Sequence, residues 1–229
     1  MLKRWSDLPS RIDHTILRPE ATRVDVQRLC EEAIRHAFHV VFVPPCYITE
    51  AVEALADTYI LVGIPVGFPL GGHTTTTKVT EAIEGVKRGA AIVDMVMNIS
   101  LLKSGDYEAV RKDIAEVIKA TSTVEHKVIV ETCYLTEQEK ITACRLVVEA
   151  GADYVKTSTG FGPGGATVED VALFRQAVAG RAKVKASGGI RDLAATVAML
   201  EAGADRIGTS AGVKIIEEWS KAQSSSSLQ

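Results

Sequence analysis

The sequence predicts an α/β protein that folds as a single (β/α)8 TIM barrel. Short segments rich in Val and Ile alternate along the chain with segments of helical period, and eight such pairs can be counted within 229 residues. The strand-like segments mostly lack a polar alternation, which is typical of strands buried on both faces of a parallel sheet. Eight such units with short connections favour a closed barrel.

A weak internal repeat supports this fold. The sequence EAGADYVKT at residues 149–157 returns as EAGADRIGT at residues 201–209, and KRGAAIVD at residues 87–94 is a looser copy. Each copy combines the end of a helix, a glycine suited to the C′ position and the entry into a strand. A doubly wound open sheet, the alternative, needs a glycine-rich turn after its first strand, whereas residues 12–17 run into Arg18-Pro-Glu.

The elements can be placed in order along the chain. The expected strands cover residues 12–17, 40–43, 60–66, 92–99, 128–133, 154–157, 183–186 and 206–208. After the first strand, residues 23–37 form a helix with one apolar stripe, made of Val26, Leu29, Ala33, Ile34 and Ala37. Thr136 to Glu139 fits a capping box at a later helix start, and Thr167 to Asp170 resembles one. We expect one domain over residues 1–223 and a disordered, serine-rich tail over residues 224–229.

Composition excludes several classes of protein. With 46% hydrophobic residues, 24% charged residues and a formal net charge of −3, the chain has an ordinary globular composition. The charge gives no reason to expect a nucleic-acid partner or an acidic membrane surface. No apolar run approaches the ~20 residues that cross a bilayer, and the first residues lack the apolar core of a secretory signal. We therefore expect a cytoplasmic protein without a membrane partner.

The cysteines and histidines indicate neither disulfides nor a metal. Cys30, Cys46, Cys133 and Cys144 have no C-x-x-C spacing and lie in apolar segments, so we expect buried, reduced thiols. The five histidines show no spacing typical of metal ligands. We expect no metal site.

Two lysines stand near the ends of apolar strands. Lys156 lies in YVKTSTG and Lys185 in KVKASGGI. An ammonium that points inward along a buried strand is costly unless it has a partner or a task. About 6 Å apart, two such charges repel by roughly 3 kcal/mol at an effective dielectric of about 20, or about two pKa units. One lysine is then expected to be a neutral amine, the form that attacks a carbonyl; two exposed or salt-bridged lysines are the alternative.

Polar residues on neighbouring strands complete a possible reaction centre. Asp94 interrupts the apolar run AIVDMVMN, so it is either an ion-pair partner of the lysines or an acid–base group. An amine, a carboxylate and a second amine suit imine chemistry, which needs a nucleophile, a cation that lowers its pKa and a group that moves protons. Asp13 and Thr15 on the first strand, and Thr159 after the sixth, either contact substrate or cap structure.

Three glycine-containing loops indicate a phosphate site. Gly188 and Gly189 follow the seventh strand, and GTSAG, with Thr209 and Ser210, follows the eighth. Gly160 follows the sixth strand. Backbone N–H groups in glycine turns and at helix N-termini bind phosphate, and loops seven and eight are its usual place in this barrel.

These segments together resemble the deoxyribose-phosphate aldolases, which are class I, Schiff-base aldolases on a (β/α)8 barrel. The resemblance covers residues 12–212, and its most specific segment is VKTSTG at residues 155–160. The other segments follow the family's order: IDHTIL at 12–17, VGFPLG at 66–71, VDMVMN at 93–98, VETCYL at 130–135, VKASGG at 184–189 and RIGTS at 206–210. The chain departs from the family at Phe42 and Pro44, where a cysteine and an asparagine are common, and this bears on aldehyde tolerance.

The resemblance implies a reaction and a role for each central residue. Lys156 would form the imine, Lys185 would lower its pKa, and Asp94 with Lys185 and a water would move protons. The reaction would be reversible cleavage of 2-deoxy-D-ribose 5-phosphate to D-glyceraldehyde 3-phosphate and acetaldehyde, with no cofactor. The partners expected are a small phosphorylated sugar and copies of the same chain, in a homodimer or homotetramer. Another class I aldolase, or a non-catalytic sugar-phosphate-binding barrel, are the alternatives.

Overall fold

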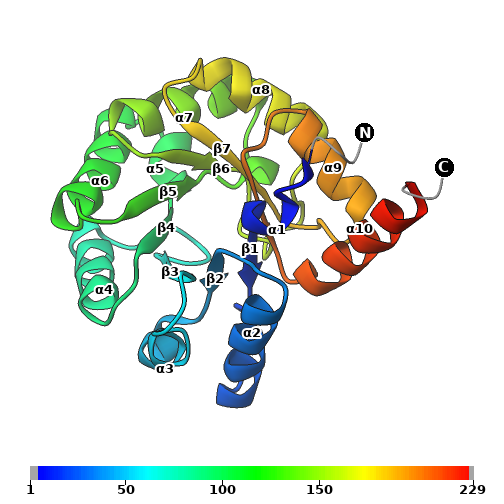
Figure 1. Ribbon diagram of the computed structural model, residues 1–229. Coiled ribbons are helices and arrows are strands. Elements are labelled where there is room, and N and C mark those ends of the chain that lie inside the picture. The colour runs from blue at the N-terminus through cyan, green and yellow to red at the C-terminus, as the bar shows by residue number, and fades with distance from the viewer. Residues whose placement is uncertain (1–4, 227–229) are drawn as a thin grey trace.

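The computed structural model describes residues 5–226, in which eight parallel strands close into a barrel in chain order (Figure 1). The predicted (β/α)8 TIM barrel is therefore confirmed. The strands are β1 Ile12–Thr15, β2 Val40–Phe42, β3 Leu61–Val66, β4 Ile92–Val96, β5 Glu125–Ile129, β6 Tyr154–Lys156, β7 Lys183–Ser187 and β8 Arg206–Thr209. Pairing of β1 with β8 closes the ring.

Helices surround the barrel and follow its strands (Figure 1). The α-helices are α1 Leu8–Arg11, α2 Arg23–Arg35, α3 Ile48–Ala54, α4 Thr75–Lys87, α5 Ile99–Lys103, α6 Tyr107–Ala120, α7 Glu137–Glu149, α8 Val168–Val178, α9 Leu193–Glu201 and α10 Gly212–Ser226. Two 3₁₀ turns, η2 Pro45–Tyr47 and η3 Thr132–Tyr134, follow β2 and β5. The last helix thus includes residues 224–226 of the predicted tail, and residues 227–229 lie outside the described part of the chain.

The fifth strand corrects the predicted placement. It runs over Glu125–Ile129 rather than over 128–133. Its first half is polar, with His126 and Lys127 buried, so hydrophobic pattern alone could not reveal it. Beyond the strand, Glu131 takes a left-handed backbone with φ 55°, which ends the extended run before η3. This bend brings Glu131 over the end of the neighbouring strand β6, because Val130 N–H donates to the Lys156 carbonyl.

Local signals explain most helix starts. Both halves of the capping box at Thr136 and Glu139 are present, as predicted. Thr167 caps α8 by accepting from Asp170 N–H alone. In α2, Ile34 is 51% exposed, so the apolar stripe is narrower than predicted and the helix ends at Arg35. Cys46 and Cys133 are also exposed, contrary to the expectation of four buried thiols, although all four cysteines are free.

The strands bury two different faces. Side chains such as Val41, Val155 and Val184 point out from the barrel and belong to the large apolar core. The inner face holds Val40, Phe42 and Ile92 together with a set of charged residues. Phe42 fits there because the facing residue is Gly63, where a Cβ atom would lie 2.5 Å from the Phe42 ring. The core therefore sits between strands and helices, and the barrel interior is left for polar groups.

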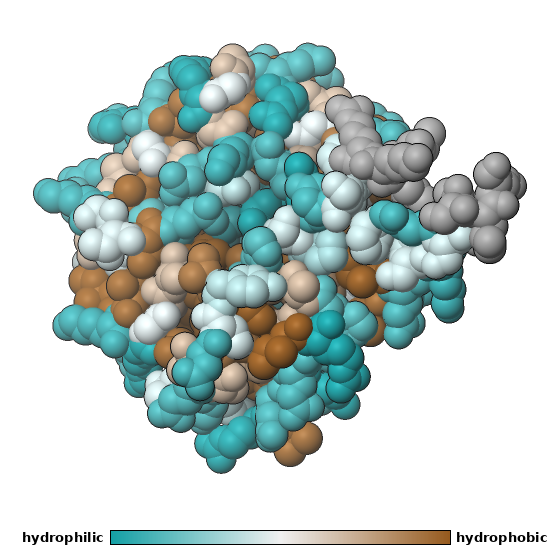
Figure 2. Space-filling model, in the orientation of Figure 1, coloured by the Kyte–Doolittle hydropathy of each residue, from teal (hydrophilic) through white to brown (hydrophobic). Residues whose placement is uncertain are grey.

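The outer surface is mostly hydrophilic on the face drawn in Figure 2, with hydrophobic residues in patches among the charged ones. Within residues 5–226 we find no helix that is long and apolar enough to cross a membrane.

Candidate active site

Three predicted residues meet inside the barrel. Strand pairing puts Lys156 of β6 directly beside Lys185 of β7. The Nζ atoms of both lysines lie 2.7 Å from the same oxygen, Oδ2 of Asp94 on β4. All three side chains are at least 94% buried. One carboxylate oxygen therefore bridges two amines in a site that excludes most water.

A second carboxylate holds the far side of Lys185. Asp13 Oδ2 lies 2.6 Å from Lys185 Nζ, and Asp13 Oδ1 accepts from Arg206 Nε at 2.6 Å. Asp13 is fully buried, and its carboxylate is occupied by these two cations. The structure thus brings Asp13 to the lysine pair, where it can fix the position and charge of Lys185.

Sequence reasoning missed a third inner lysine, Lys127 on β5. Its side chain is fully buried, its Nζ forms an ion pair with Glu125, and it lies 4.0 Å from Asp94 Oδ1. The three lysine Nζ atoms surround the ring of Phe42, with Lys185 at 3.9 Å from the ring centroid, Lys156 at 5.6 Å and Lys127 at 5.8 Å. An aromatic face attracts ammonium groups, so the Phe42 ring lowers the cost of crowding them. The sequence feature that could have indicated Lys127 is its charge within the strand segment EHKVI at residues 125–129.

Burial and neighbouring charges shift the pKa values of Lys156 and Lys185 in opposite directions. Burial lowers the Lys156 pKa to about 8; the repulsion from Lys185 acts in the same direction, against the attraction of Asp94. Burial also acts to lower the pKa of Lys185, but Asp13 and Asp94 outweigh it and raise that pKa above its usual value. Burial opposes ionisation of Asp94, yet the surrounding lysines hold its pKa below the usual range. Lys156 is therefore the amine of the pair that loses its proton first.

A charge count leads to the same result. The cluster contains three carboxylates, Asp13, Asp94 and Glu125, in contact with Lys127, Lys156, Lys185 and Arg206. If Lys156 is neutral, three cations balance three anions. Since unbalanced charge is costly in a buried site, this balance favours loss of the Lys156 proton and so acts with burial to lower the pKa of Lys156.

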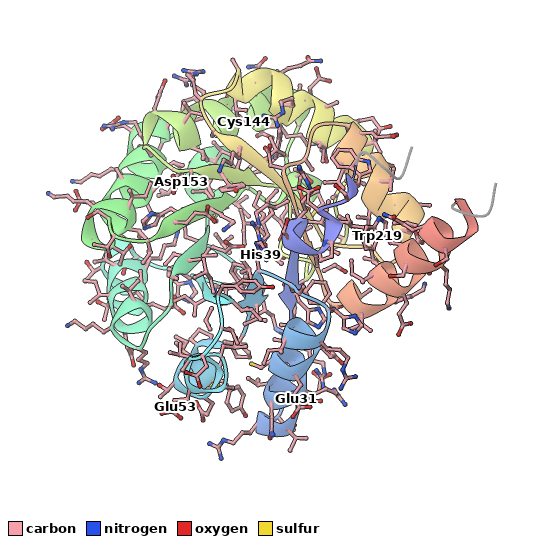
Figure 3. All side chains as sticks on the ribbon, in the orientation of Figure 1. Glu31, His39, Glu53, Cys144, Asp153 and Trp219 are labelled. Carbon is pink, nitrogen blue, oxygen red and sulfur yellow. The ribbon has the colours of Figure 1, made fainter. Side chains whose placement is uncertain are left out.

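A cavity of about 280 Å³ opens above Lys156 at the carboxyl ends of the strands. Its wall includes Lys156 together with Thr15, Thr159, Gly160, Gly188, Gly189, Thr209 and Ser210. All the predicted loop residues therefore face one space. Asp13, which we also predicted to bind substrate, is not part of this wall and lies below it with Asp94 and Lys185. In Figure 3, the labelled His39 and Asp153 precede β2 and β6 and so mark the opposite, amino end of the barrel.

The glycine loops at the cavity have left-handed backbone and pack closely on one another. Gly160, Gly188 and Gly189 have backbone φ angles of 84°, 89° and 81°, which residues other than glycine rarely adopt. A Cβ atom on Gly165 would lie 2.2 Å from the Gly188 carbonyl oxygen, so the loop after β6 packs tightly on the loop after β7. The cavity wall also contains Arg18 and Arg191, two cations that we did not predict.

Hydroxyl groups on the wall already have partners. Thr15 Oγ1 donates to the Asp13 carbonyl at 2.9 Å, and Thr209 Oγ1 donates to the Ile190 carbonyl at 2.7 Å. Thr209 Oγ1 also accepts from Ala211 N–H at 2.9 Å, just before α10 begins. These hydroxyls therefore support the loops from within the cavity wall, and substrate contact by Thr15 stays a prediction.

Glu131 is a further buried carboxylate beside the cavity. It is 2% exposed and accepts from Thr159 through both the backbone N–H and the hydroxyl. Burial raises the pKa of Glu131, against the effect of these hydrogen bonds and of the Lys156 charge. The sequence analysis assigned no role to Glu131. Its position directly after the apolar run VIV was the sequence feature that could have indicated a buried carboxylate. Among residues 5–226, we find no group of three or more His, Cys, Asp or Glu side chains that could hold a metal ion.

Comparisons with known sequences agree with one another. A family model described as DeoC/LacD family aldolase matches residues 10–218. A deoxyribose-phosphate aldolase of Thermoanaerobacter sp. is 57% identical over 218 residues, which are 94% of this chain and 98% of the relative. A deoxyribose-phosphate aldolase of Thermococcus gammatolerans is 53% identical over 215 residues, with coverage of 92% and 96%.

Solved structures share the whole barrel. An aldolase called QR15 superposes with a TM-score of 0.92 at 42% identity, over 95% of this chain and 98% of the other. The deoxyribose phosphate aldolase of Aeropyrum pernix, described as a unique tetrameric structure, gives a TM-score of 0.88 at 34% identity, over 94% and 92%.

Proposed function

Because the chain belongs to the DeoC/LacD family of aldolases, we propose that it cleaves 2-deoxy-D-ribose 5-phosphate reversibly, through a Schiff base on Lys156. The chain is an enzyme of the class I aldolase type, and the products are D-glyceraldehyde 3-phosphate and acetaldehyde. The observation that carries the assignment of Lys156 is its contact with Asp94, 2.7 Å away, inside a site that lowers the lysine pKa to about 8.

Imine formation uses the central cluster. The neutral amine of Lys156 attacks the C1 aldehyde, and the nitrogen then loses a proton while the former carbonyl oxygen leaves as water. Asp94 lies within hydrogen-bond distance of that nitrogen and accepts and returns the proton, with Lys185 as the second member of the relay. Asp13 and Arg206 keep Lys185 in place.

Cleavage of the C2–C3 bond then needs a base and an electron sink. Removal of the C3 hydroxyl proton, through a water held by Asp94 and Lys185, turns that oxygen into the carbonyl of glyceraldehyde 3-phosphate. The electrons of the C2–C3 bond move onto the imine and give an enamine. Protonation of the enamine at C2 and hydrolysis of the imine release acetaldehyde and regenerate the Lys156 amine.

The substrate phosphate binds at the glycine loops. The N–H groups around Gly188 and Gly189 and the N-terminus of α10, with Ser210 before it, can surround a dianion. Thr209 supports this loop, and Gly160 leaves room beside Gly188. Arg18 and Arg191 add positive charge along the same cavity.

We infer that the chain acts as a homodimer or homotetramer in the cytoplasm. The Aeropyrum pernix relative is described as tetrameric. Exposed apolar side chains on the outside of the barrel, Ile34, Tyr59 and Leu61, are 46–64% exposed and suit burial between subunits. Four free thiols suit a reducing compartment. Sedimentation of the purified protein gives the oligomeric state directly, and a monomer at micromolar concentration would contradict the inference.

Borohydride trapping tests the mechanism. In the presence of acetaldehyde, reduction should attach an ethyl group to Lys156, and peptide mass spectrometry should find it there. Lys78 is an internal control, because it is also buried with a lowered pKa but is paired with Asp113 outside the cavity. An adduct mainly on Lys185, or none, would overturn the assignment. Turnover of a phosphorylated ketose in place of deoxyribose 5-phosphate would favour another class I aldolase.

A further inference from the structure

Glu131 is a buried carboxylate beside the cavity, and within the described residues it forms no direct ion pair. Its backbone is left-handed, with φ 55° and ψ 70°, a conformation that costs a residue with a side chain free energy. Its carboxylate is buried one strand away from Lys156. A strained backbone and a buried carboxylate at a cavity suggest a functional reason for both.

The carboxylate of Glu131 contacts mainly Thr159, with the Cys133 thiol as a weaker donor to Oε1 at 4.0 Å. The Thr159 N–H points at the carboxylate, 3.2 Å from Oε1 and 3.3 Å from Oε2, and the Thr159 hydroxyl makes a short hydrogen bond to Oε2. An ionised carboxylate only accepts, so the hydroxyl proton must point toward Glu131. The hydroxyl oxygen in turn accepts from Phe161 N–H at 3.0 Å.

This arrangement fixes what Thr159 can offer to a ligand. A hydroxyl has one proton to donate and two lone pairs to accept. Glu131 takes the proton and Phe161 takes one lone pair, which leaves one lone pair for the cavity that Thr159 lines. The side chain therefore presents a hydrogen-bond acceptor and no donor.

We propose that Glu131 is a positioning residue that orients the Thr159 hydroxyl so that this part of the cavity accepts a hydrogen bond from a hydroxyl group of the sugar phosphate. This rests on the proposed function, because it names how that substrate is recognised. Thr159 lies three residues after Lys156 and next to Gly160, so it stands between the imine position and the phosphate loops. A sugar chain held at both ends passes Thr159 with its hydroxyl groups.

Replacement of Glu131 by glutamine tests the polarity. Glu131→Gln keeps the size of the side chain and the left-handed backbone. We expect its oxygen in the place of Oε1, where it accepts from the Thr159 N–H, so that the NH₂ group in the place of Oε2 donates to Thr159 Oγ1 and turns the hydroxyl proton toward the cavity. We expect kcat/KM for 2-deoxy-D-ribose 5-phosphate to fall at least tenfold. Trapping of acetaldehyde on Lys156 should fall far less than kcat/KM, since acetaldehyde has no hydroxyl group.

Variants of Thr159 test the coupling. Thr159→Val should lose about as much kcat/KM as Glu131→Gln, Thr159→Ser should retain most of it, and the double variant Glu131→Gln/Thr159→Val should lose no more than either single variant. Asp153→Asn is the matched control, because Asp153 also accepts a backbone N–H, from His126 at 2.8 Å, but at the amino end of the barrel (Figure 3). Its kcat/KM should stay within twofold of wild type.

Several outcomes would overturn the proposal. An unchanged kcat/KM in folded Glu131→Gln, an equal loss in Asp153→Asn, or fully additive losses in the double variant would each make Glu131 a structural residue only. If Glu131→Gln does not fold, Glu131→Asn tests the same contact, because asparagine tolerates left-handed backbone better and its side chain, one methylene shorter, withdraws the acceptor from Thr159; the same loss of kcat/KM is expected. Absence of acetaldehyde trapping in the wild type would instead contradict the proposed function, so the two failures are distinguishable.

Discussion

Burial dominates the chemistry of Lys156. Before the structure, repulsion from Lys185 was the expected cause of a neutral amine. In the structure, burial is the main cause of the lowered Lys156 pKa, and the repulsion from Lys185 adds to it against the attraction of Asp94. Lys185 has a second task, because it bridges Asp13 and Asp94 and so holds both carboxylates ionised.

Replacement of Lys185 should separate these two effects. A proton on Lys156 blocks attack on the aldehyde, so in the wild type kcat/KM should rise with pH through a value near 8. In Lys185→Met, loss of the repulsion raises the Lys156 pKa, and the rise should move to higher pH. Each unit of this shift costs about tenfold in kcat/KM at pH 7. A folded variant with an unchanged pH profile would show that Lys185 does not tune the nucleophile.

The central residues could be named from the sequence, while their partners could not. Lys156, Lys185 and Asp94 each interrupt an apolar run, which makes a buried charge visible. Arg206 and Lys127 stand near strand starts among other polar residues, where exposure is the ordinary expectation. Only the closure of the barrel brings Arg206 to Asp13, 193 positions earlier in the chain.

At the scale of elements, the loops after β6, β7 and β8 form one end of the cavity, where we propose that the substrate phosphate binds. The loops could be predicted because glycine and hydroxyl residues mark the turns, but Arg18 and Arg191 could not, since nothing local indicates that they line the cavity. The fifth strand was misplaced for a similar reason: its polar first half is buried only because the barrel interior itself is charged.

A negative charge in these loops should harm one substrate selectively. Gly189→Glu or Ser210→Asp repels the phosphate dianion and obstructs the N–H groups, so kcat/KM for 2-deoxy-D-ribose 5-phosphate should fall at least tenfold. Because remote binding energy can assist the reaction, kcat can fall as KM rises. Cleavage of unphosphorylated 2-deoxyribose should change little. Equal losses for both substrates in a folded variant would make these loops structural.

A buried ion pair joins helices α4 and α6 outside the barrel. Lys78 Nζ lies 2.6 Å from Asp113 Oδ2 and donates to the Val96 carbonyl at the end of β4, and both side chains are at least 98% buried. Asp113→Ala leaves the Lys78 charge buried without its carboxylate, so the free energy of unfolding should fall by about 3 to 5 kcal/mol. Urea denaturation measures this change. The matched control is Glu84→Ala, which breaks the exposed Arg88–Glu84 pair at the end of the same helix α4. A similar small effect in both variants would contradict the prediction.

At the scale of the whole molecule, the sequence period was enough to predict the barrel. A repeated βα unit can bury its apolar strands only against its neighbours, and eight units close the sheet. The period says nothing about the inner face, where Asp13, Asp94, Lys127, Lys156, Lys185 and Arg206 meet from different strands. Folding therefore creates the charged interior, and part of the stability of the barrel must depend on pH.

The Lys156 contribution to that dependence has a definite sign. Its pKa is about 8 in the folded protein and about 10.4 in an unfolded chain. Between these values the unfolded chain holds a proton that the folded protein has lost, so raising the pH stabilises the folded state, by up to about 3 kcal/mol in total. Burial raises the thiol pKa of Cys30 to about 11 and that of Cys144 to about 12. Above about pH 8.5 the unfolded chain loses these protons while the folded protein keeps them, so raising the pH there destabilises the folded state.

Comparison with Lys156→Met isolates the contribution of Lys156 to the pH dependence of the free energy of unfolding, because both proteins contain the same cysteines and their contributions cancel. The free energy of unfolding of the wild type, minus that of Lys156→Met, should increase by about 2 to 3 kcal/mol from pH 7 to pH 10. Urea denaturation at a series of pH values measures the difference. If this difference does not change with pH, the fold does not lower the pKa of the Lys156 amine, and the barrel interior does not prepare the nucleophile before substrate binds.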